Sequence, residues 1–519
     1  MNRFVGLTVG ALFIAAGLIV FATELAGPAR TREWTPTATP IELTVMCAAG
    51  LRKPAEACAA GFTAATGITV RFQYGGSGQL IGQLAAGMPA DLYLPADESY
   101  MKIGKEKKLL REVIPLAEMH PVIAVQAGNP KSITSLDTLL SSGVKFAVAS
   151  PEAASIGRTL KEGLADRWPP LAAAATVTKT TVTDLLNDLQ VQSVDAAIVW
   201  DSTIHGIKGL TAVEDPALTK LVERSGGAVT EACTKPANAL ALLRWMASPE
   251  KGNPAWLAAG FIPLHGDAWA TKPSLTFYCG SVNRVAIQTS LKEFADREGA
   301  EINTVYNGCG ILCASMKQMA LDKFALPDAY FACDICFVPS VAEHFPEAVI
   351  LTDASIVIAV PKGNPKNIKT LADLARPGLR VGIGNAKQST LGYMTDFMLD
   401  AAKVKNAVLA NAVSQVPQGD LLVTQLRTGT LDAAIVYNTN AKPLSEFLDV
   451  VPLNVPGATA MQPFAVEKDS MHAQLAGRML DYLRANRARF EAAGFRWRDN
   501  LKPVSSFSFP ANPAAANRP

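Results

Sequence analysis

Two turns of small residues in this sequence could hold an anion without a counter-charge. Gly75-Gly76-Ser77-Gly78 stands between an expected strand and an expected helix, and Tyr306-Asn307-Gly308-Cys309-Gly310 repeats the arrangement later in the chain. A fully deprotonated oxyanion only accepts hydrogen bonds, and hydroxyl groups and helix N-termini both donate them. Each such bond to a charged acceptor contributes about 1.5–3 kcal/mol, so five or six give tight binding. Neither turn contains Lys or Arg, which indicates an anion site made of neutral donors.

Cysteines form the second group of reactive side chains. Five of the eight follow successive expected strands, whose loops meet at one edge of a parallel sheet. The eight cysteines are Cys47, Cys58, Cys233, Cys279, Cys309, Cys313, Cys333 and Cys336. Three interpretations remain open: disulfides of an oxidising compartment, a thiolate or soft-metal site, and buried thiols acting as small apolar residues. The pair at 333 and 336 is a weak metal signal, because zinc sites usually combine two such pairs or add histidine.

Catalytic motifs are absent from the sequence. The five histidines are scattered, and no His-Glu-x-x-His, phosphate-loop or Gly-x-Ser-x-Gly pattern occurs. We therefore expect neither an enzyme nor a cofactor. The net charge is +2 and no long basic run is present, so no nucleic-acid partner is expected either.

The N-terminal residues 1–33 predict export. Residues 4–23 are apolar or small and uncharged, long enough to span a bilayer as a helix. We interpret 1–33 as a membrane anchor or signal segment and favour the uncleaved anchor. Either interpretation places the rest of the protein in the periplasm or outside the cytoplasm, and the anchor would hold it at the inner membrane.

The rest of the 519-residue chain is an internal duplication. Matched positions are 232 residues apart at Leu43 and Leu275 and 237 apart at Trp200 and Tyr437. In each copy short apolar runs alternate with amphipathic stretches, which predicts β-α-β units. The expected fold is α/β, with two tandem modules at 40–268 and 272–500, each of two lobes with mostly parallel sheets. The Pro- and Ala-rich residues 501–519 are expected to be a disordered tail.

Both copies resemble the periplasmic molybdate-binding proteins of ABC importers, which are type II periplasmic binding proteins. The resemblance covers about 42–265 and 275–500, and it is carried by the Ser77 turn and by Pro89-Ala90-Asp91-Leu92-Tyr93-Leu94. It implies ligand contacts from hydroxyls and from main-chain N–H groups at helix starts. The implied residues are Gly50, Ser77, Ile156, Val182 and Trp200 in the first copy, and Ser281, Cys309, Leu391, Gly419 and Tyr437 in the second.

Several of these positions depart from the family pattern. Gly50 stands where the family has serine, Trp200 where it has tyrosine, and Cys309 where it has the second serine. Because Tyr437 and Ser281 retain hydroxyls, we expect the second copy to be the better oxyanion site. A thiolate at Cys309 would repel an anion, so we expect this thiol to be protonated or disulfide-bonded.

The resemblance implies a solute-binding protein that captures a small oxyanion, such as molybdate or tungstate, for an ABC permease and ATPase. Two alternatives stay open. The cysteines of the second copy could make a thiol- or soft-metal-binding redox or enzyme module, or the chain could be a sensor or scaffold.

Overall fold

The computed structural model describes residues 41–141 and 143–510, and they form two α/β modules that repeat one plan. The expected anchor at 1–33 lies outside the described residues. No helix of the described part is long and apolar enough to cross a membrane.

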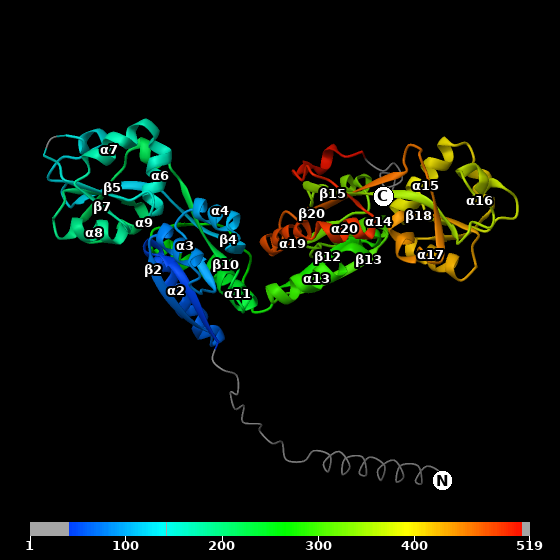
Figure 1. Ribbon diagram of the computed structural model, residues 1–519, viewed down its shortest axis with the longest axis horizontal. Coiled ribbons are helices and arrows are strands. Elements are labelled where there is room, and N and C mark those ends of the chain that lie inside the picture. Colours follow the sequence, from blue (N-terminus) through cyan, green and yellow to red (C-terminus); the bar gives the residue numbers. More distant parts are fainter. Residues whose placement is uncertain (1–40, 142, 511–519) are drawn as a thin grey trace, which may run out of the picture. The chain divides into compact units, whose positions relative to one another are not determined.

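The first module has two lobes, each built on one sheet (Figure 1). In lobe one the strand order is β11-β4-β10-β3-β1-β2, and in lobe two it is β7-β6-β8-β5-β9. The strands are β1 (Glu42–Ala48), β2 (Thr69–Gly75), β3 (Leu92–Leu94), β4 (Leu110–Met119), β5 (Pro121–Gln126), β6 (Phe146–Ala149), β7 (Val177–Lys179), β8 (Ala196–Trp200), β9 (Leu210–Val213), β10 (Glu223–Thr230) and β11 (Ile262–Pro263). The helices that position the site are α2 (Arg52–Thr66), α3 (Ser77–Ala85), α4 (Glu98–Glu106), α6 (Ser155–Leu164), α8 (Val182–Gln190) and α11 (Pro236–Ala247).

The second module repeats these elements on one continuous sheet. Strand β15 runs from one lobe into the other, whereas the first module breaks the equivalent path between β4 and β5 at His120. The strands are β12 (Ser274–Gly280), β13 (Glu301–Asn307), β14 (Ala329–Phe331), β15 (Glu347–Pro361), β16 (Val381–Gly384), β17 (Ala412–Val416), β18 (Ala433–Tyr437), β19 (Leu448–Pro452), β20 (Thr459–Val466), β21 (Arg496–Trp497) and β22 (Val504–Ser505). The helices are α13 (Arg284–Glu298), α14 (Cys309–Leu321), α15 (Thr390–Ala401), α16 (Lys405–Ala410), α17 (Gly419–Arg427), α18 (Asn438–Ala441), α19 (Ala473–Ala485) and α20 (Arg487–Ala493).

The predicted fold class is confirmed, with mixed rather than mostly parallel sheets. Strand β1 pairs in parallel with β2 and β3, as β-α-β units require. The strands that return across the module, β4 and β10, pair antiparallel. The parallel strands end at the edge where the two lobes face each other, and this places the following helix starts at the cleft.

Ordered structure extends further toward the C-terminus than the sequence suggested. The prediction of a disordered tail from 501 is wrong for the residues around β22. Val504 and Ser505 pair with β15, and the Ser506 N–H donates to the Pro346 carbonyl at 2.8 Å. The composition of this segment gave no sign of it, because two ladder positions carry too little periodicity to detect. Residues 511–519 lie outside the described part.

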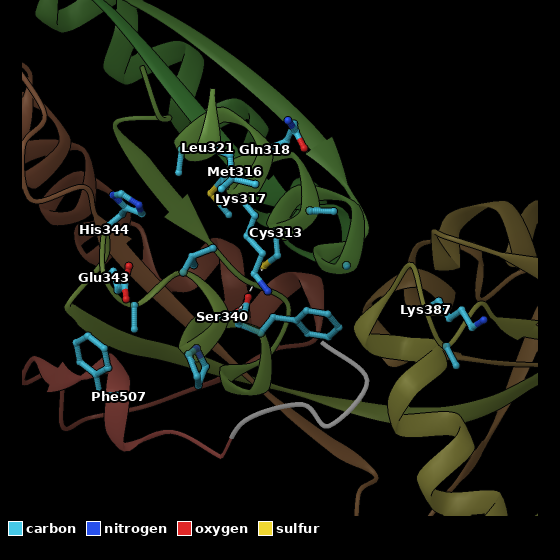
Figure 2. Close-up of a pocket in the computed structure, with 18 residues that line it drawn as sticks. Cys313, Met316, Lys317, Gln318, Leu321, Ser340, Glu343, His344, Lys387 and Phe507 are labelled. Carbon is cyan, nitrogen blue, oxygen red and sulfur yellow. Dashed lines mark hydrogen bonds between the residues drawn. The ribbon is translucent and has the colours of Figure 1, made fainter. Parts of the chain in front are cut away.

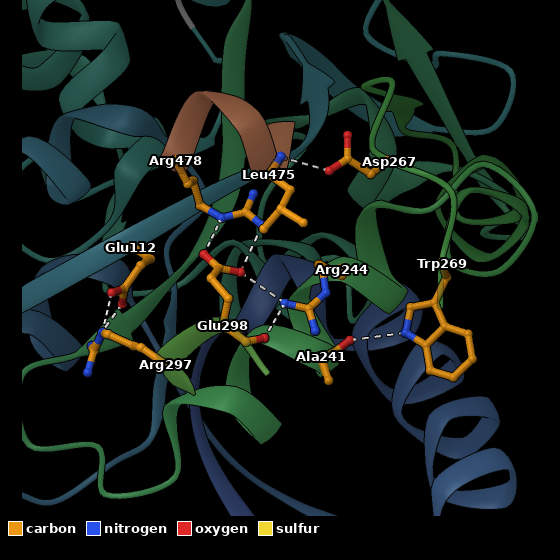
Figure 3. Close-up of polar contacts among 9 residues, drawn as sticks. All are labelled: Glu112, Ala241, Arg244, Asp267, Trp269, Arg297, Glu298, Leu475 and Arg478. Atoms are coloured by element: carbon orange, nitrogen blue, oxygen red, sulfur yellow. Dashed lines mark hydrogen bonds and ion pairs between the residues drawn. The ribbon is translucent and has the colours of Figure 1, made fainter. Parts of the chain in front are cut away.

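Each module has its own apolar core. One cluster of buried side chains contains only residues of the second copy, and the other two contain only residues of the first. Buried and partly buried ion pairs connect the two copies. Glu298 of α13 forms ion pairs with Arg244 of α11, at 3.0 Å, and with Arg478 of α19, at 2.7 Å. Figure 3 shows both guanidinium groups pointing at this one carboxylate.

The Glu298 carboxylate is 1% exposed, so its charge depends on the two arginines. Burial alone would raise its pKa, but Arg478 and Arg244 outweigh this effect and lower the pKa below its ordinary value. Nearby, Asp267 accepts hydrogen bonds from the backbone N–H groups of Gln474 and Leu475, both at 2.8 Å, at the start of α19. The linker between the copies is thus tied to the second module by defined bonds.

We predict that Glu298→Gln lowers the free energy of unfolding by about 3–5 kcal/mol, because two buried guanidinium groups lose their counter-charge. Chemical denaturation at neutral pH measures this. The difference from the unchanged protein should shrink as the pH falls through the lowered pKa of Glu298, where the carboxylate is protonated. Asp296→Asn, which removes an exposed ion pair with Lys292 on the same helix, is the matched control and should have little effect. An equal loss in both variants would contradict the role of burial.

We also propose that residues 40–268 and 272–500 fold separately, since no apolar core is shared between them. Expressed alone, each half should melt cooperatively. Each should be less stable than in the full chain, because neither half alone contains the ion pair between Arg244 and Glu298. Failure of both halves to show a cooperative transition would contradict this boundary.

Candidate functional site

Four helix starts converge on one small cavity in the first module. They belong to the 3-10 turn η1 (Ala49–Leu51) and to α3, α6 and α8. The cavity has a volume of about 20 Å³, enough for a water-sized group. All five residues predicted for this copy line it, together with Ala96 and Ser155: they are Gly50, Ser77, Ile156, Val182 and Trp200. No charged side chain lines the cavity.

The Ser77 hydroxyl is oriented by two donors. It accepts a hydrogen bond from the Ala96 N–H at 3.1 Å and one from the Ser155 hydroxyl at 2.7 Å. A hydroxyl has two acceptor positions and one proton. Because both acceptor positions are used, the Ser77 proton is left to donate to a group in the cavity. Ser155 was not among the predicted residues.

Trp200 explains why the cavity is small. Its side chain is 1% exposed and lies at the end of β8, where it packs beside the Gly50 backbone. A Cβ atom added at Gly50 would lie 3.1 Å from Val182 Cγ2 and 3.8 Å from Trp200 Cδ1. The indole is larger than the phenol of Tyr437 at the equivalent position of the second copy, and it therefore takes up space that the smaller ring would leave open.

The two lobes of the first module meet backbone to backbone at the Ser77 turn. The Gly78 N–H of lobe one donates to the Ala153 carbonyl of lobe two at 3.0 Å. A Cβ at Gly76 would lie 2.2 Å from that carbonyl oxygen, and one at Gly78 would lie 2.1 Å from the Glu152 oxygen. Both distances are far below contact, so only glycine permits this closed arrangement.

The second module closes in the same way. The Gly310 N–H donates to the Gln388 carbonyl at 3.1 Å, and a Cβ at Gly308 would lie 2.4 Å from the same oxygen. The Gly-x-Gly spacing that the sequence displays twice is thus a lobe-closing contact in both copies.

The five residues predicted for the second copy lie on its equivalent elements. Cys309 begins α14, Leu391 lies in the first turn of α15 and Gly419 begins α17. Tyr437 ends β18, and its buried hydroxyl has no hydrogen-bond partner among the described residues. Ser281 lies in the 3-10 turn η3 (Ser281–Asn283) and is partly exposed. The η3 turn contacts α17, the helix that Gly419 begins.

Cys309 is a buried thiol with unusual surroundings. Its sulfur accepts a hydrogen bond from the Cys333 N–H at 2.9 Å. Burial alone would raise the pKa of the Cys309 thiol, but hydrogen bonding, led by Cys333, outweighs burial and lowers the pKa. The pKa of Cys333 is raised, first by its hydrogen bond with Cys309 and then by burial. Cys309 is therefore the thiol of the pair that loses its proton more easily.

A family model described as "Bacterial extracellular solute-binding protein" matches residues 43–262 and 275–496. The chain belongs to this family. It is a family of solute-binding proteins rather than enzymes, and its two matches in tandem correspond to the two modules. The duplication inferred from the sequence is therefore confirmed as two copies of one solute-binding unit.

Related solute-binding proteins include "Molybdate-binding protein ModA" of Mycobacterium tuberculosis, 28% identical over 242 residues, which are 45% of this chain and 90% of that protein. The Escherichia coli protein with the same description is 32% identical over 132 residues, 24% of this chain and 51% of that protein. Among solved structures, the Azotobacter vinelandii periplasmic molybdate-binding protein is 19% identical with a TM-score of 0.37, covering 42% of this chain and 98% of that one.

The cysteines of this solute-binding protein are all free thiols, and all but Cys233 are buried. The disulfide interpretation is therefore wrong for this structure. Of the two states expected for Cys309, protonated or disulfide-bonded, the structure has no disulfide there. Within the described ranges, no three His, Cys, Asp or Glu side chains are grouped so that they could hold a metal ion. Most of the cysteines match the third interpretation, because they fill core positions as small residues.

A larger cavity, in the second module, is lined by none of the predicted residues. It has a volume of about 810 Å³ and lies between α14 and the 3-10 helix η4 (Ile335–Val341). Figure 2 shows Cys313, Met316 and Phe507 among its lining residues. In the first copy the α-helix α4 occupies the position of η4. Pro339, inside η4, is the only hint of this difference that the sequence offers.

We predict that Gly78→Ala weakens solute binding by the first module at least about tenfold, or about 1.4 kcal/mol. The added Cβ would collide with the Glu152 carbonyl and hold the lobes apart. Gly82→Ala on the same helix, where a Cβ meets nothing within 4 Å, is the matched control and should bind normally. Calorimetric titration measures both variants. Unchanged affinity in Gly78→Ala would show that closure at this turn is not needed.

Proposed function

We propose that this solute-binding protein captures a small tetrahedral oxyanion of the molybdate and tungstate class in its first module and delivers it to an ABC permease and ATPase. The observation that carries the proposal is the Ser77 hydroxyl, whose two acceptor positions are filled by Ala96 and Ser155. Its proton is then available to donate into a cavity bounded by helix starts. At such a position a ligand that only accepts hydrogen bonds gains the most binding energy. The molybdate-binding relatives support the choice of anion.

The absence of charged side chains from the cavity lining favours a fully deprotonated anion. A ligand that carried a proton would need an acceptor, and both acceptor positions of the Ser77 hydroxyl are already occupied. A tetrahedral oxyanion is larger than a water molecule, so binding requires the lobes or the Trp200 indole to move outward slightly. The interlobe bond at Gly78 then closes over the ligand.

We assign the oxyanion to the first copy, which revises the expectation that the second is the better site. Ser155 supplies the first copy with a hydroxyl that sequence reasoning missed. In the second copy the Cys309 thiol stands in place of the Ser77 hydroxyl, and a thiol is a poorer hydrogen-bond donor to an anion than a hydroxyl. The membrane anchor at 1–33 remains part of the proposal, since it would keep the captured solute near an inner-membrane permease.

Ser77→Ala is expected to weaken molybdate binding by about 1–3 kcal/mol, the range for one buried hydrogen bond to a charged acceptor. Isothermal titration of the full chain with molybdate, tungstate, sulfate and phosphate measures the loss and the order of preference.

Ser225→Ala is the matched control for this substitution. Ser225 is equally buried, but its hydroxyl donates to the Ala117 carbonyl in β4, away from the cavity. Its loss should leave molybdate affinity unchanged. Equal affinity in Ser77→Ala and the unchanged protein would contradict the proposed site.

A further inference from the structure

Three differences between the copies coincide at one point in the second module. Cys309 replaces Ser77, Cys333 replaces Ala96, and Gly280 replaces Ala48. The backbone frame is conserved between the two sets. The Ala96 N–H donates to Ser77 at 3.1 Å, and the Cys333 N–H donates to Cys309 at 2.9 Å. The equivalent hydrogen bond therefore holds the Ser77 hydroxyl in the first copy and the Cys309 thiol, beside Cys333, in the second.

Gly280 makes room for both sulfurs. A Cβ at this residue would lie 2.3 Å from Cys333 Sγ and 3.0 Å from Cys309 Sγ, so both sulfurs are near the same position. Alanine, which the first copy has here, would collide with Cys333. Glycine at residue 280 is thus required for the Cys333 sulfur to lie beside Cys309.

The lobe facing these thiols contributes hydroxyl groups. Thr390 of α15 and Tyr437 of β18 both lie near the Cys309 sulfur. The Tyr437 hydroxyl is buried and has no hydrogen-bond partner among the residues described. A small ligand between the lobes would therefore meet two thiols on one side and an unpaired phenol on the other.

We propose that the second module binds a small uncharged oxyacid with a thiophilic centre, the class of arsenous acid, through the sulfurs of Cys309 and Cys333. This inference rests on the proposed role of the chain in solute capture and gives the second module a different solute from the first. Soft thiolate ligands prefer soft, polarisable centres, whereas the first module offers only hard donors for an oxyanion.

The bonding step is an exchange without oxidation or reduction. Arsenous acid, As(OH)3, loses two hydroxyl groups as two arsenic–sulfur bonds form. Each departing hydroxyl takes the proton of one thiol and leaves as water, and the third hydroxyl stays on arsenic. That remaining hydroxyl can bond with the Tyr437 hydroxyl. Cys309 attacks first, because its lowered pKa supplies the thiolate more readily than Cys333 does.

Native mass spectrometry of the reduced full chain with sodium arsenite, together with a count of free thiols, tests this proposal. We expect arsenite to add to the chain and the thiol count to fall by two. Cys309→Ser and Cys333→Ala install the residues of the first copy, and each should abolish the addition. Cys313→Ser is the matched control, because Cys313 lies on the same helix but bonds Tyr330 and Phe337 instead.

Retained arsenite binding in Cys309→Ser or Cys333→Ala, or its loss in Cys313→Ser, would overturn the proposal, as would no binding to the unchanged chain. A disulfide between Cys309 and Cys333 in the protein as isolated, seen as two missing thiols, would overturn it too. Molybdate titration of the same samples reports on the first module separately. Molybdate binding without arsenite binding rejects only this inference, whereas arsenite binding without molybdate binding rejects the proposed oxyanion function.

Discussion

Backbone contact between the two lobes of each module is the constraint on which the rest of the structure depends. At Gly76 and Gly78, and again at Gly308 and Gly310, the turn after the second strand touches carbonyl groups of the opposite lobe at distances that leave no room for a side chain. This contact brings the starts of α3, α6 and α8 to one point. No charged side chain lines the cavity at this point, so a ligand in the proposed site would be selected by hydrogen bonding and by its size.

Duplication keeps this frame and changes the chemistry inside it. The hydrogen bond from the Ala96 N–H to Ser77 has its counterpart in the bond from the Cys333 N–H to Cys309, so the backbone makes the same contact at this position in both copies. The side chains differ: one site has hydroxyls beside an indole, and the other has thiols beside an unpaired tyrosine. The buried pairing of Glu298 with Arg244 and Arg478 joins the copies, while each retains its own core.

The order of strands and helices could be read from the sequence because strand and helix periods recur in both copies at nearly constant spacing. The positions of Ser77, Ile156 and Val182 followed from the family pattern, and the cavity brings them together. Ser155 was missed, because a serine beside a helix start looks like an ordinary cap until its hydroxyl is seen to reach Ser77. The thiol pair was also beyond the sequence, since Cys309 and Cys333 are separated by a helix and a strand and only the fold shows that Gly280 makes room for both. The Pro- and Ala-rich composition of the C-terminal residues also gave no indication of β22, which pairs through only two residues.

A crystal structure of the full chain grown with molybdate, with anomalous scattering data collected at the molybdenum edge, tests the central claim most directly. The account predicts an anomalous peak in the first module, with oxygens in hydrogen-bond range of the Ser77 hydroxyl and of the N–H groups at the starts of α6 and α8. A peak in the second module beside Cys309, with none near Ser77, would contradict it.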